Sequence, residues 1–457
     1  MNIAGKNVLV FGSGVSGIGA AGLIGKMGAC PIIFDGNTAV DRQDILNKMG
    51  DGCTPEIYIG ELPAQVKDKL DLVVLSPGVP TDLPLVKEFY SRGIRVWGEV
   101  ELAYQASLSR RVLAVTGTNG KTTTTALLGK IFSDYEESVF VVGNIGTSYT
   151  STALLMREDS VTVAELSSFQ LETIDTFAPR VSAILNITED HLDRHHTMEA
   201  YIEAKEAIVR NQTENDVCVL NYEDSVLREF GQGITPACVY FSSVRKLPRG
   251  IFLRNESGGR WIIWKDENGE IPVVELKSLK LLGQHNYENV MAATAMAYCA
   301  GVPMEHIRQS ICAFQAVAHR IEYVAEKNGV VYYNDSKGTN PDAAIKGIQA
   351  MNRPTWLIAG GYDKSADYRE WIRAFGGKVR CLVLIGQTRE KIAHAAREEG
   401  FTEIQMAENL EEAVGICAKM ARPQEAVLLS PACASWGQFD NYEQRGDMFK
   451  AYVHKLE

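Results

Sequence analysis

The chain has 457 residues, of which 46% are hydrophobic and 23% charged, and its formal net charge at pH 7 is −11. This length predicts two to four domains, and this composition is typical of globular proteins rather than of disordered or fibrous ones. The acidic balance argues against broad binding of nucleic acid or anionic membranes, which needs a basic surface. No apolar run reaches the roughly 18 residues of a membrane span, and the first residues lead into a predicted strand instead of a signal peptide. We therefore expect a cytoplasmic protein.

The first hundred residues alternate short apolar runs with helix-forming segments. Apolar strands separated by helices predict a parallel sheet that is covered on both faces. The expected strands are Asn7–Phe11, Pro31–Asp35, Asp71–Leu75 and Ile94–Trp97. This pattern predicts a Rossmann-like domain.

A glycine-rich turn, Gly12–Gly17 (GSGVSG), follows the first of these strands and lies 18 positions before Asp35, which satisfies the dinucleotide-binding fingerprint. One interpretation is a nicotinamide dehydrogenase, and a second is that the glycines only let the helix pack closely on the strand. A third interpretation is that the domain binds the diphosphate of a nucleotide-linked substrate. Ser76, in a turn after another strand, lies at the same predicted sheet edge and could line that pocket.

The segment Arg110–Thr125 (RRVLAVTGTNGKTTTT) reads as a strand, a glycine loop and the start of a helix. In this arrangement the loop N–H groups and the helix N-terminus face a phosphate, a lysine neutralises it, and a hydroxyl reaches Mg²⁺. Lys121 and Thr122 are the lysine and the hydroxyl residue. The common pattern has its first glycine where Val115 stands, so the loop is a shortened variant. The segment predicts a nucleoside-triphosphate site.

Two further α/β series follow the first domain. In the second series we expect strands at Val161–Ala164 and Val181–Leu185, hairpins between Gly250 and Leu276, and a long helix from about His285 to Ala300. In the third series the expected strands are Val330–Tyr333, Trp356–Ala359, Cys381–Ile385 and Ala426–Leu429. The sequence therefore predicts an α/β protein of three domains. They are an N-terminal Rossmann-like parallel sheet over residues 1–107, a central P-loop-type ATPase domain over 108–317, and a C-terminal Rossmann-like domain over 318–457.

Polar residues in the central domain are candidates for a metal site. Glu165 ends a predicted strand near the phosphate loop, and its carboxylate suits Mg²⁺. For His191 the residues alone favour a surface or core role over a metal ligand. Lys205 lies on a predicted helix, where the pattern favours a solvent-facing lysine paired with neighbouring glutamates. His195 and His196 are predicted to be solvated turn residues.

Basic and hydroxyl residues recur at the start of the third series and where its strands end. Such side chains suit carboxylates and a phosphoryl group in transfer. The motifs are HRIE at 319–322, NDSKGTNP at 334–341, GGYDK at 360–364 and SPACASWGQF at 430–439. Their recurrence at the predicted carboxyl ends of strands indicates a site.

Taken in order, these motifs resemble the Mur ligases across essentially the whole chain. The segments that carry the resemblance are GTNGKTTT, Glu165, DHLDRH, the Lys205 helix, GQHNYEN, HRIE, NDSKGTNP and SPACASWGQFDNYEQRG. Asn119 in the glycine loop and the HRIE and NDSKGTN forms look like the member that adds D-glutamate, whereas the L-alanine-adding ligase typically has His in the loop. The resemblance thus implies an ATP-dependent ligase that adds D-glutamate to UDP-N-acetylmuramoyl-L-alanine through an acyl phosphate, in cytoplasmic peptidoglycan precursor synthesis.

The resemblance also implies roles for single residues. The residues implied to bind ATP are Gly117, Thr118, Asn119, Gly120, Lys121, Thr122, Asn286, Asn289, Arg320 and Asp335. The residues implied to bind the UDP-linked substrate or D-glutamate are Gly14, Asp35, Ser76, Asn144, His319, Thr339, Ser430 and Phe439. The implied metal ligands are Thr122, Glu165, His191 and Lys205, of which Lys205 matches a lysine that the family carbamylates. The implied catalytic residues are Lys121, Lys205, His191, Lys337 and Lys364.

The resemblance implies ATP and two Mg²⁺ ions, one of them held through carbamylated Lys205, and we expect a monomer that binds neither nucleic acid nor membrane. Three alternatives remain. A folylpolyglutamate synthetase-like ligase shares the glycine loop but leaves the N-terminal domain unexplained. A nicotinamide dehydrogenase leaves Lys121, Lys337 and Lys364 unexplained, and a nucleotide sensor would bind ATP without turnover. Phosphate release that depends on both UDP-muramoyl-alanine and D-glutamate would favour the ligase.

Overall fold

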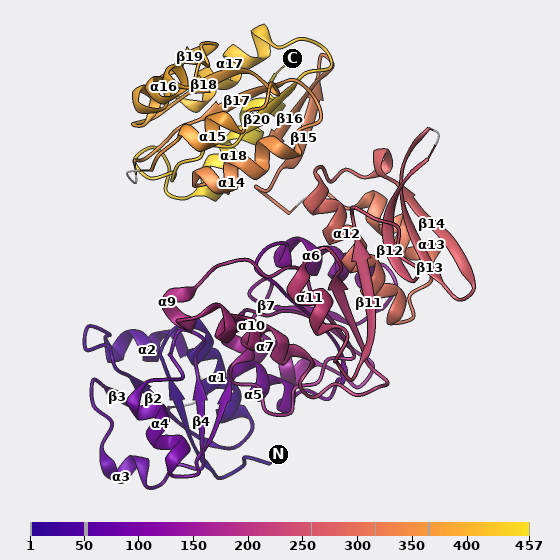
Figure 1. Cartoon of the computed structure of the whole chain (residues 1–457). Helices are drawn as coiled ribbons and strands as arrows, with labels where there is room; N and C mark the ends of the chain where they lie inside the picture. Colours follow the sequence, from indigo (N-terminus) through magenta and orange to yellow (C-terminus); the bar gives the residue numbers. More distant parts are fainter. Residues whose placement is uncertain (1, 50–53, 257, 316, 364–365, 457) are drawn as a thin grey trace. The chain divides into compact units, whose positions relative to one another are not determined.

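The computed structural model describes residues 2–49, 54–256, 258–315, 317–363 and 366–456. The chain divides into two compact units, Met1–Val274 with Glu288–Ile311, and Glu275–Tyr287 with Cys312–Glu457. Strands and helices alternate along the chain, which confirms the expected α/β class (Figure 1). In the described part of the chain no helix is long and apolar enough to cross a membrane.

The first sheet has five parallel strands in the order β3-β2-β1-β4-β5. The order reverses between β1 and β4, and the carboxyl ends of strands at such a point form the usual ligand site of an open sheet. Alternate residues of β1 face opposite sides, so that Val8 packs in one core cluster and Leu9 in another with Phe89 of α4. The elements are β1 Asn7–Phe11, α1 Val15–Lys26, β2 Cys30–Asp35, α2 Arg42–Met49, β3 Glu56–Ile59, α3 Ala64–Lys67, β4 Leu72–Leu75, α4 Pro84–Ser91, β5 Arg95–Gly98 and α5 Glu99–Ala106.

The second sheet has nine strands in the order β14-β13-β12-β11-β10-β9-β6-β8-β7. Strand β6, which leads into the phosphate loop, is parallel to both of its neighbours, β8 and β9. Strands β12 and β13 form the expected antiparallel hairpin. The strands are β6 Arg111–Thr116, β7 Val139–Gly143, β8 Val161–Glu165, β9 Val181–Ile184, β10 Val217–Asn221, β11 Ala237–Ser242, β12 Gly250–Glu256, β13 Gly259–Asp266 and β14 Gly269–Glu275.

Eight α-helices follow α5 along this part of the chain, as far as the described residues go. They are α6 Lys121–Ser133, α7 Tyr149–Thr152, α8 Ser168–Leu171, α9 Leu192–His195, α10 Met198–Glu206, α11 Ser225–Phe230, α12 Gln284–Cys299 and α13 Met304–Ala313. The long helix expected from about His285 to Ala300 is confirmed as α12. Its first four residues belong to the second unit and the remainder to the first.

One hydrophobic cluster contains residues of both sheets of the first unit, including Val10 of β1 and Ala114 of β6. Glu101 of α5 adds a polar connection, because its fully buried carboxylate accepts backbone N–H bonds from Asp175, Thr176 and Phe177 at 2.9, 3.0 and 2.9 Å. A buried carboxylate needs such donors, since an unpaired charge would be costly. Glu101 therefore fixes the segment before β9 against the helix that follows the first sheet.

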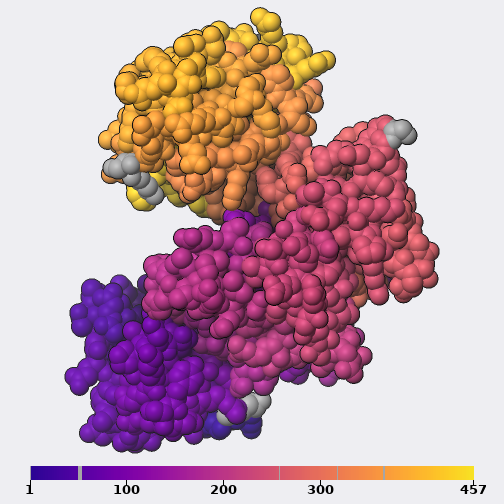
Figure 2. Space-filling model, in the orientation of Figure 1, coloured from indigo at the N-terminus to yellow at the C-terminus, as the bar shows by residue number. Residues whose placement is uncertain are grey.

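The second unit contains a six-stranded sheet in the order β15-β16-β20-β17-β18-β19, parallel except for the β15–β16 pair. Its two faces bury alternate strand residues: α14, α15 and α16 cover one face, and α17 and α18 cover the other. Residues of this sheet and its helices, orange to yellow in Figure 2, form a closely packed body. The elements are β15 Glu322–Lys327, β16 Val330–Asn334, α14 Pro341–Ala350, β17 Thr355–Ala359, α15 Arg369–Arg373, β18 Val379–Leu384, α16 Arg389–Glu398, β19 Ile404–Met406, α17 Leu410–Met420, β20 Ala426–Leu429 and α18 Tyr442–His454.

Glu101→Gln tests the polar connection inside the first unit. The amide keeps the shape of the side chain but replaces a charged acceptor, so we expect the unfolding free energy to fall by about 2 kcal/mol. Urea unfolding followed by fluorescence measures the change, with Glu61→Gln at an exposed position as the matched control. Equal midpoints for both variants would contradict this role of Glu101.

Candidate active site

The phosphate loop lies between β6 and α6 and needs glycine at two positions. Gly117 and Gly120 have φ angles of 146° and 87°, in the region that side chains disfavour. A Cβ atom on Gly120 would lie 2.3 Å from Oδ1 of Asn289. Asn186, which follows β9, accepts the N–H of Asn119 at 2.8 Å and donates to its carbonyl at 3.1 Å. Asn186 thus fixes the loop, and it was not among the predicted site residues.

Two lysines meet at the carbonyl oxygen of Gly117. Lys121 Nζ donates to it at 2.8 Å and to the carbonyl of Thr118 at 3.0 Å, and Lys205 Nζ donates to the Gly117 carbonyl at 2.9 Å. The first lysine starts α6 and the second comes from α10. The structure therefore brings together two residues that are 84 positions apart in the sequence.

Thr122 and Glu165 also meet beside the loop, where the Thr122 hydroxyl donates to Glu165 Oε1 at 3.3 Å. Glu165 ends β8, which pairs directly with β6, and is buried. A hydroxyl and a carboxylate supply the oxygen ligands that Mg²⁺ prefers. The residues present therefore fit a nucleotide-bound magnesium ion, although no group of three His, Cys, Asp or Glu side chains with metal-binding geometry occurs among the described residues.

Lys205 is only 2% exposed, so the solvent-facing position that the helix pattern favours is wrong. Its Nζ lies 4.6 Å from the ring centroid of Tyr201, whose hydroxyl is 3.0 Å from that of Thr118. Burial, with the charge of Lys121 added, lowers the pKa of Lys205 to about 7. A large share of this amine is therefore neutral near physiological pH.

The histidines after β9 differ from one another. His191 has a φ of 53°, is half exposed, and lies 3.5 Å from Asp190 and edge-on to Phe169. His195 is buried, which corrects its prediction as a solvated residue: its Nε2 is 2.9 Å from the Ser168 hydroxyl. Burial lowers the pKa of His195. His196 is exposed, as expected.

Two of the residues implied to bind ATP lie in the first turns of α12. Asn289 is buried beside the phosphate loop and accepts a hydrogen bond from the Thr124 hydroxyl at 3.3 Å. Asn286 belongs to the second unit and donates to the carbonyl of Leu282 at 2.7 Å. Asn289 is thus directly tied to the loop in the first unit.

The GSGVSG turn has the close packing that its glycines predict. A Cβ atom on Gly17 would lie 1.9 Å from the carbonyl oxygen of Gly12, and the Ser76 hydroxyl donates to the same oxygen at 3.1 Å. Asp35 accepts the N–H and the hydroxyl of Ser13 at 2.9 and 2.5 Å. Burial alone would raise the pKa of Asp35, but these hydrogen bonds and one from Asn37 hold it below its usual value.

Two other candidates for binding the UDP-linked substrate are exposed. Gly14 lies at the N-terminus of α1. Asn144 follows β7, and its N–H donates to the carbonyl of Glu165 at 3.1 Å. Asn144 therefore lies next to the end of β8, beside the phosphate loop.

In the second unit the candidates surround the carboxyl ends of β16 and β20. Asp335 is buried and accepts the Ser430 hydroxyl at 2.7 Å, and burial raises the pKa of Asp335 to about 7. His319 is buried with Nδ1 3.0 Å from Asn334 Nδ2, and burial lowers the pKa of His319. Arg320 is exposed, so its guanidinium is accessible to a ligand.

The remaining candidates of this unit lie at different depths. Lys337 is half-buried, with Nζ 5.2 Å from the ring centroid of Tyr442. Thr339 follows it in the same loop, and Phe439 is half-buried against the cluster beneath α17 and α18. Lys364 lies outside the described residues, so its prediction stays untested.

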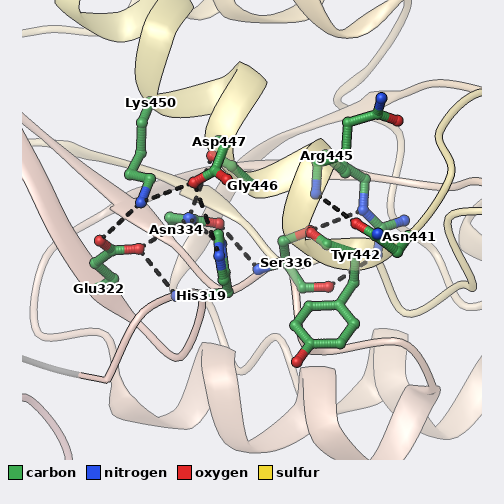
Figure 3. Close-up of polar contacts among 11 residues, drawn as sticks. His319, Glu322, Asn334, Ser336, Asn441, Tyr442, Arg445, Gly446, Asp447 and Lys450 are labelled. Carbon is green, nitrogen blue, oxygen red and sulfur yellow. Dashed lines mark hydrogen bonds and ion pairs between the residues drawn. The ribbon is translucent and has the colours of Figure 1, made fainter. Parts of the chain in front are cut away.

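Arg445 and Tyr442 of α18 are further residues, after Asn186, that motif reasoning missed (Figure 3). Arg445 is fully buried, with Nε 2.9 Å from the Ser336 hydroxyl and its terminal nitrogens 2.8 and 3.1 Å from the carbonyls of Ser336 and Cys433. It therefore joins the loop after β16 to the loop after β20. The sequence points to Arg445 only through its place in EQRG, the end of the motif SPACASWGQFDNYEQRG.

The fold and the glycine loop together define a P-loop-type nucleotide-binding α/β protein. Three family models match the chain: the Mur ligase MurD-like N-terminal domain over residues 6–98, the Mur ligase middle domain over 115–297, and the Mur ligase glutamate ligase domain over 319–433. The UDP-N-acetylmuramoylalanine–D-glutamate ligase of Lachnoclostridium phytofermentans is 55% identical over 457 residues, which is 100% of both chains. This protein therefore belongs to the Mur ligase family, and its similarity to the D-glutamate-adding members covers its whole length.

Solved structures of the family have the same fold. The UDP-N-acetylmuramate–alanine ligase MurC from Thermotoga maritima matches with a TM-score of 0.58 at 20% identity, covering 98% of this chain and 99% of that one. A MurF ligase from Thermotoga maritima, solved in complex with ADP, matches with a TM-score of 0.58 at 17% identity, covering 93% and 95%. At these identities the likeness confirms the fold and is not evidence for a substrate.

The depressed pKa of Lys205 predicts how stability depends on pH. The unfolded lysine titrates near 10.4 and the folded one near 7, so between these values the unfolded state binds more protons and stability rises with pH. Below about pH 7 both states are protonated and the full cost of the buried charge is present. In carbon-dioxide-free buffer we expect the melting temperature of the native chain to rise, relative to Lys205→Met, as pH increases from about 7 to 10. Parallel profiles for the two proteins would contradict this expectation.

Proposed function

We propose that this protein is an ATP-dependent ligase that joins D-glutamate to UDP-N-acetylmuramoyl-L-alanine, in cytoplasmic peptidoglycan precursor synthesis. The single observation that carries the proposal is the 55% identity, over the full length of both chains, to a ligase of that name. The site adds the chemistry, because Lys121, Thr122 and Glu165 gather around a phosphate loop. We also propose that it acts as a monomer without nucleic acid.

We divide the roles among three domains. Residues 1–107 would bind the UDP-linked substrate around Gly14, Asp35 and Ser76, with Asn144 of the next domain beside it. Residues 108–317 would bind ATP. Residues 318–457 would bind D-glutamate and contribute to ATP binding through Arg320 and Asp335. Support comes from the position of Gly14, Asp35, Ser76, Asn144 and Asp335 at or just after the carboxyl ends of strands, where open α/β sheets bind ligands. Arg320 precedes β15, whose first residue pairs with the last residue of β16.

The phosphate loop would hold the phosphates of ATP. Lys121 lies within reach of the loop carbonyls and so can exchange those bonds for phosphate oxygens. Thr122 and Glu165 would hold Mg²⁺, which neutralises phosphate charge when it is bound. The residues proposed to contact ATP are Gly117, Thr118, Asn119, Gly120, Lys121, Thr122, Asn286, Asn289, Arg320 and Asp335.

Lys205 is suited to carbamylation because only a neutral amine attacks carbon dioxide. Its pKa of about 7 leaves much of it neutral at physiological pH. The neutral amine nitrogen bonds to the carbon of CO₂ and releases a proton, so the neutral side chain becomes an anion; the fraction that starts as a cation first loses a further proton. This change removes the repulsion between Lys205 and Lys121, and the carbamate, together with His191, would supply ligands for a second Mg²⁺.

The proposed reaction has two steps. The alanine carboxylate attacks the γ-phosphorus of ATP and ADP leaves, which gives an acyl phosphate. The neutral amine of D-glutamate then attacks the acyl carbon, loses a proton, and inorganic phosphate leaves as the amide forms. Lys121, Lys337 and Lys364 would lower the repulsion among the anionic groups, and His319, Thr339, Ser430 and Phe439 would position D-glutamate.

A phosphate-release assay across amino-acid acceptors tests the function. With UDP-N-acetylmuramoyl-L-alanine and ATP present, we expect turnover with D-glutamate and none above background with L-alanine, L-lysine or meso-diaminopimelate. Lys121→Ala should reduce this turnover by about a thousandfold, because it removes the charge that meets the phosphates. Turnover that ignores D-glutamate, or a Lys121→Ala variant of near-normal rate, would refute the assignment.

The carbamate has its own test in Lys205→Ala. If a carboxylate-like group is needed at this position, a short carboxylic acid such as acetate or propionate should restore part of the lost activity, because the truncated side chain leaves room for it. The matched control is Lys205→Met, which fills the space and should not respond. Equal responses of the two variants to the added acids would count against a carbamate.

A further inference from the structure

The turn His319–Ile321 has an unusual backbone for its residues. His319 and Ile321 have φ angles of 64° and 48°, and a β-branched residue such as isoleucine strongly disfavours this left-handed region. Ile321 is nevertheless buried in a core cluster of the second unit. Arg320 stands between the two and is exposed. A strained turn of this kind persists only where its surroundings hold it in place.

Neighbouring groups bond to the backbone of this turn from several sides. Glu322 Oε2 accepts the N–H of His319 at 2.9 Å, and the N–H of Lys337 donates to the carbonyl of His319 at 3.0 Å. Asp335 accepts a hydrogen bond from the backbone of Ile321. Of these groups, the Glu322 carboxylate also accepts Asn334 Nδ2 at 3.0 Å, so it ties the turn to the end of β16.

The Glu322 carboxylate is itself held by a cation from α18. Lys450 Nζ lies 3.2 Å from Glu322 Oε1 and 3.0 Å from Asp447 Oδ1. The side chains of Lys450 and Glu322 point toward one another in Figure 3. The side chains of Glu322 and Lys450 are only 15% and 26% exposed, so solvent screens their pairing less than that of a surface pair. Gly446 lets α18 approach closely, since a Cβ there would lie 2.1 Å from His319 Nδ1.

We propose that Lys450 is a positioning residue for nucleotide binding, acting through Glu322 on the strained turn that presents Arg320. This inference rests on the proposed role of Arg320 in binding ATP. Lys450 fixes the direction of the carboxylate, the carboxylate holds the N–H of His319, and the turn then keeps the Arg320 guanidinium in one orientation. Lys450 itself touches no substrate in this scheme.

The experiment measures binding of a non-hydrolysable ATP analogue with Mg²⁺ to the full chain by calorimetry. Lys450→Met removes the charge while keeping much of the length, and we expect the analogue to bind about fivefold more weakly. Lys450→Arg keeps the cation and should restore most of the affinity. Lys419→Met on the neighbouring helix α17, at an exposed position, is the matched control and should bind like the native chain.

A double-mutant cycle separates positioning from a merely structural role. If Lys450 acts through Arg320, then Lys450→Met should cause no further loss of analogue affinity in an Arg320→Ala variant. Lys450→Met should lower the melting temperature by the same amount in the native chain and in Arg320→Ala. Additive losses of affinity, or native affinity in Lys450→Met, would overturn the proposal. If the native chain binds the analogue but shows no turnover that depends on D-glutamate, the proposed function is refuted. The effect of Lys450 on nucleotide affinity can still be measured in that case.

Discussion

Two lysine ammonium groups that share one carbonyl oxygen set the chemistry of the phosphate loop. Lys121 and Lys205 both donate to Gly117, and their mutual repulsion, added to burial, favours the neutral form of Lys205. The loop is held by the hydrogen bonds of Asn186 to Asn119 and lies against Asn289 at Gly120. An anion placed beside these two lysines stabilises the site, whether it is a nucleotide phosphate or a carbamate formed on Lys205 itself.

Several strands at the centres of the sheets could be predicted from the sequence because they are continuously apolar. Strand β1 has the predicted bounds, and β16, β17 and β20 differ from theirs by one residue at most. Strands with other patterns were missed. β15 has charged residues at both of its ends and is an antiparallel edge strand, and β19 has only three residues. The edge strands β3 and β7 were also not predicted, nor were β10 and β11, although these two lie inside the nine-stranded sheet.

The candidate site could be predicted where chemistry depends on local sequence, as in the loop that contains Lys121. Burial of single polar side chains could not, because it depends on elements distant in the chain. Lys205 looks solvent-facing within α10 and is buried where its Nζ meets the carbonyl of Gly117 in the loop after β6. His195 is buried by its contact with Ser168, and Arg445 by two loops from separate strands. The three-domain boundaries stay a prediction, since the compact units number two.

The path of the chain through α12 has a consequence for folding during synthesis. Residues 275–287 belong to the second unit, and the chain returns to the first unit only at Glu288. A nascent chain that has emerged as far as Val274 therefore lacks Asn289, which packs against Gly120 of the phosphate loop. Domains fold as units while translation proceeds from the N-terminus, so the two sheets of the first unit can form early. The loop meets Asn289 only after part of the following unit has left the ribosome.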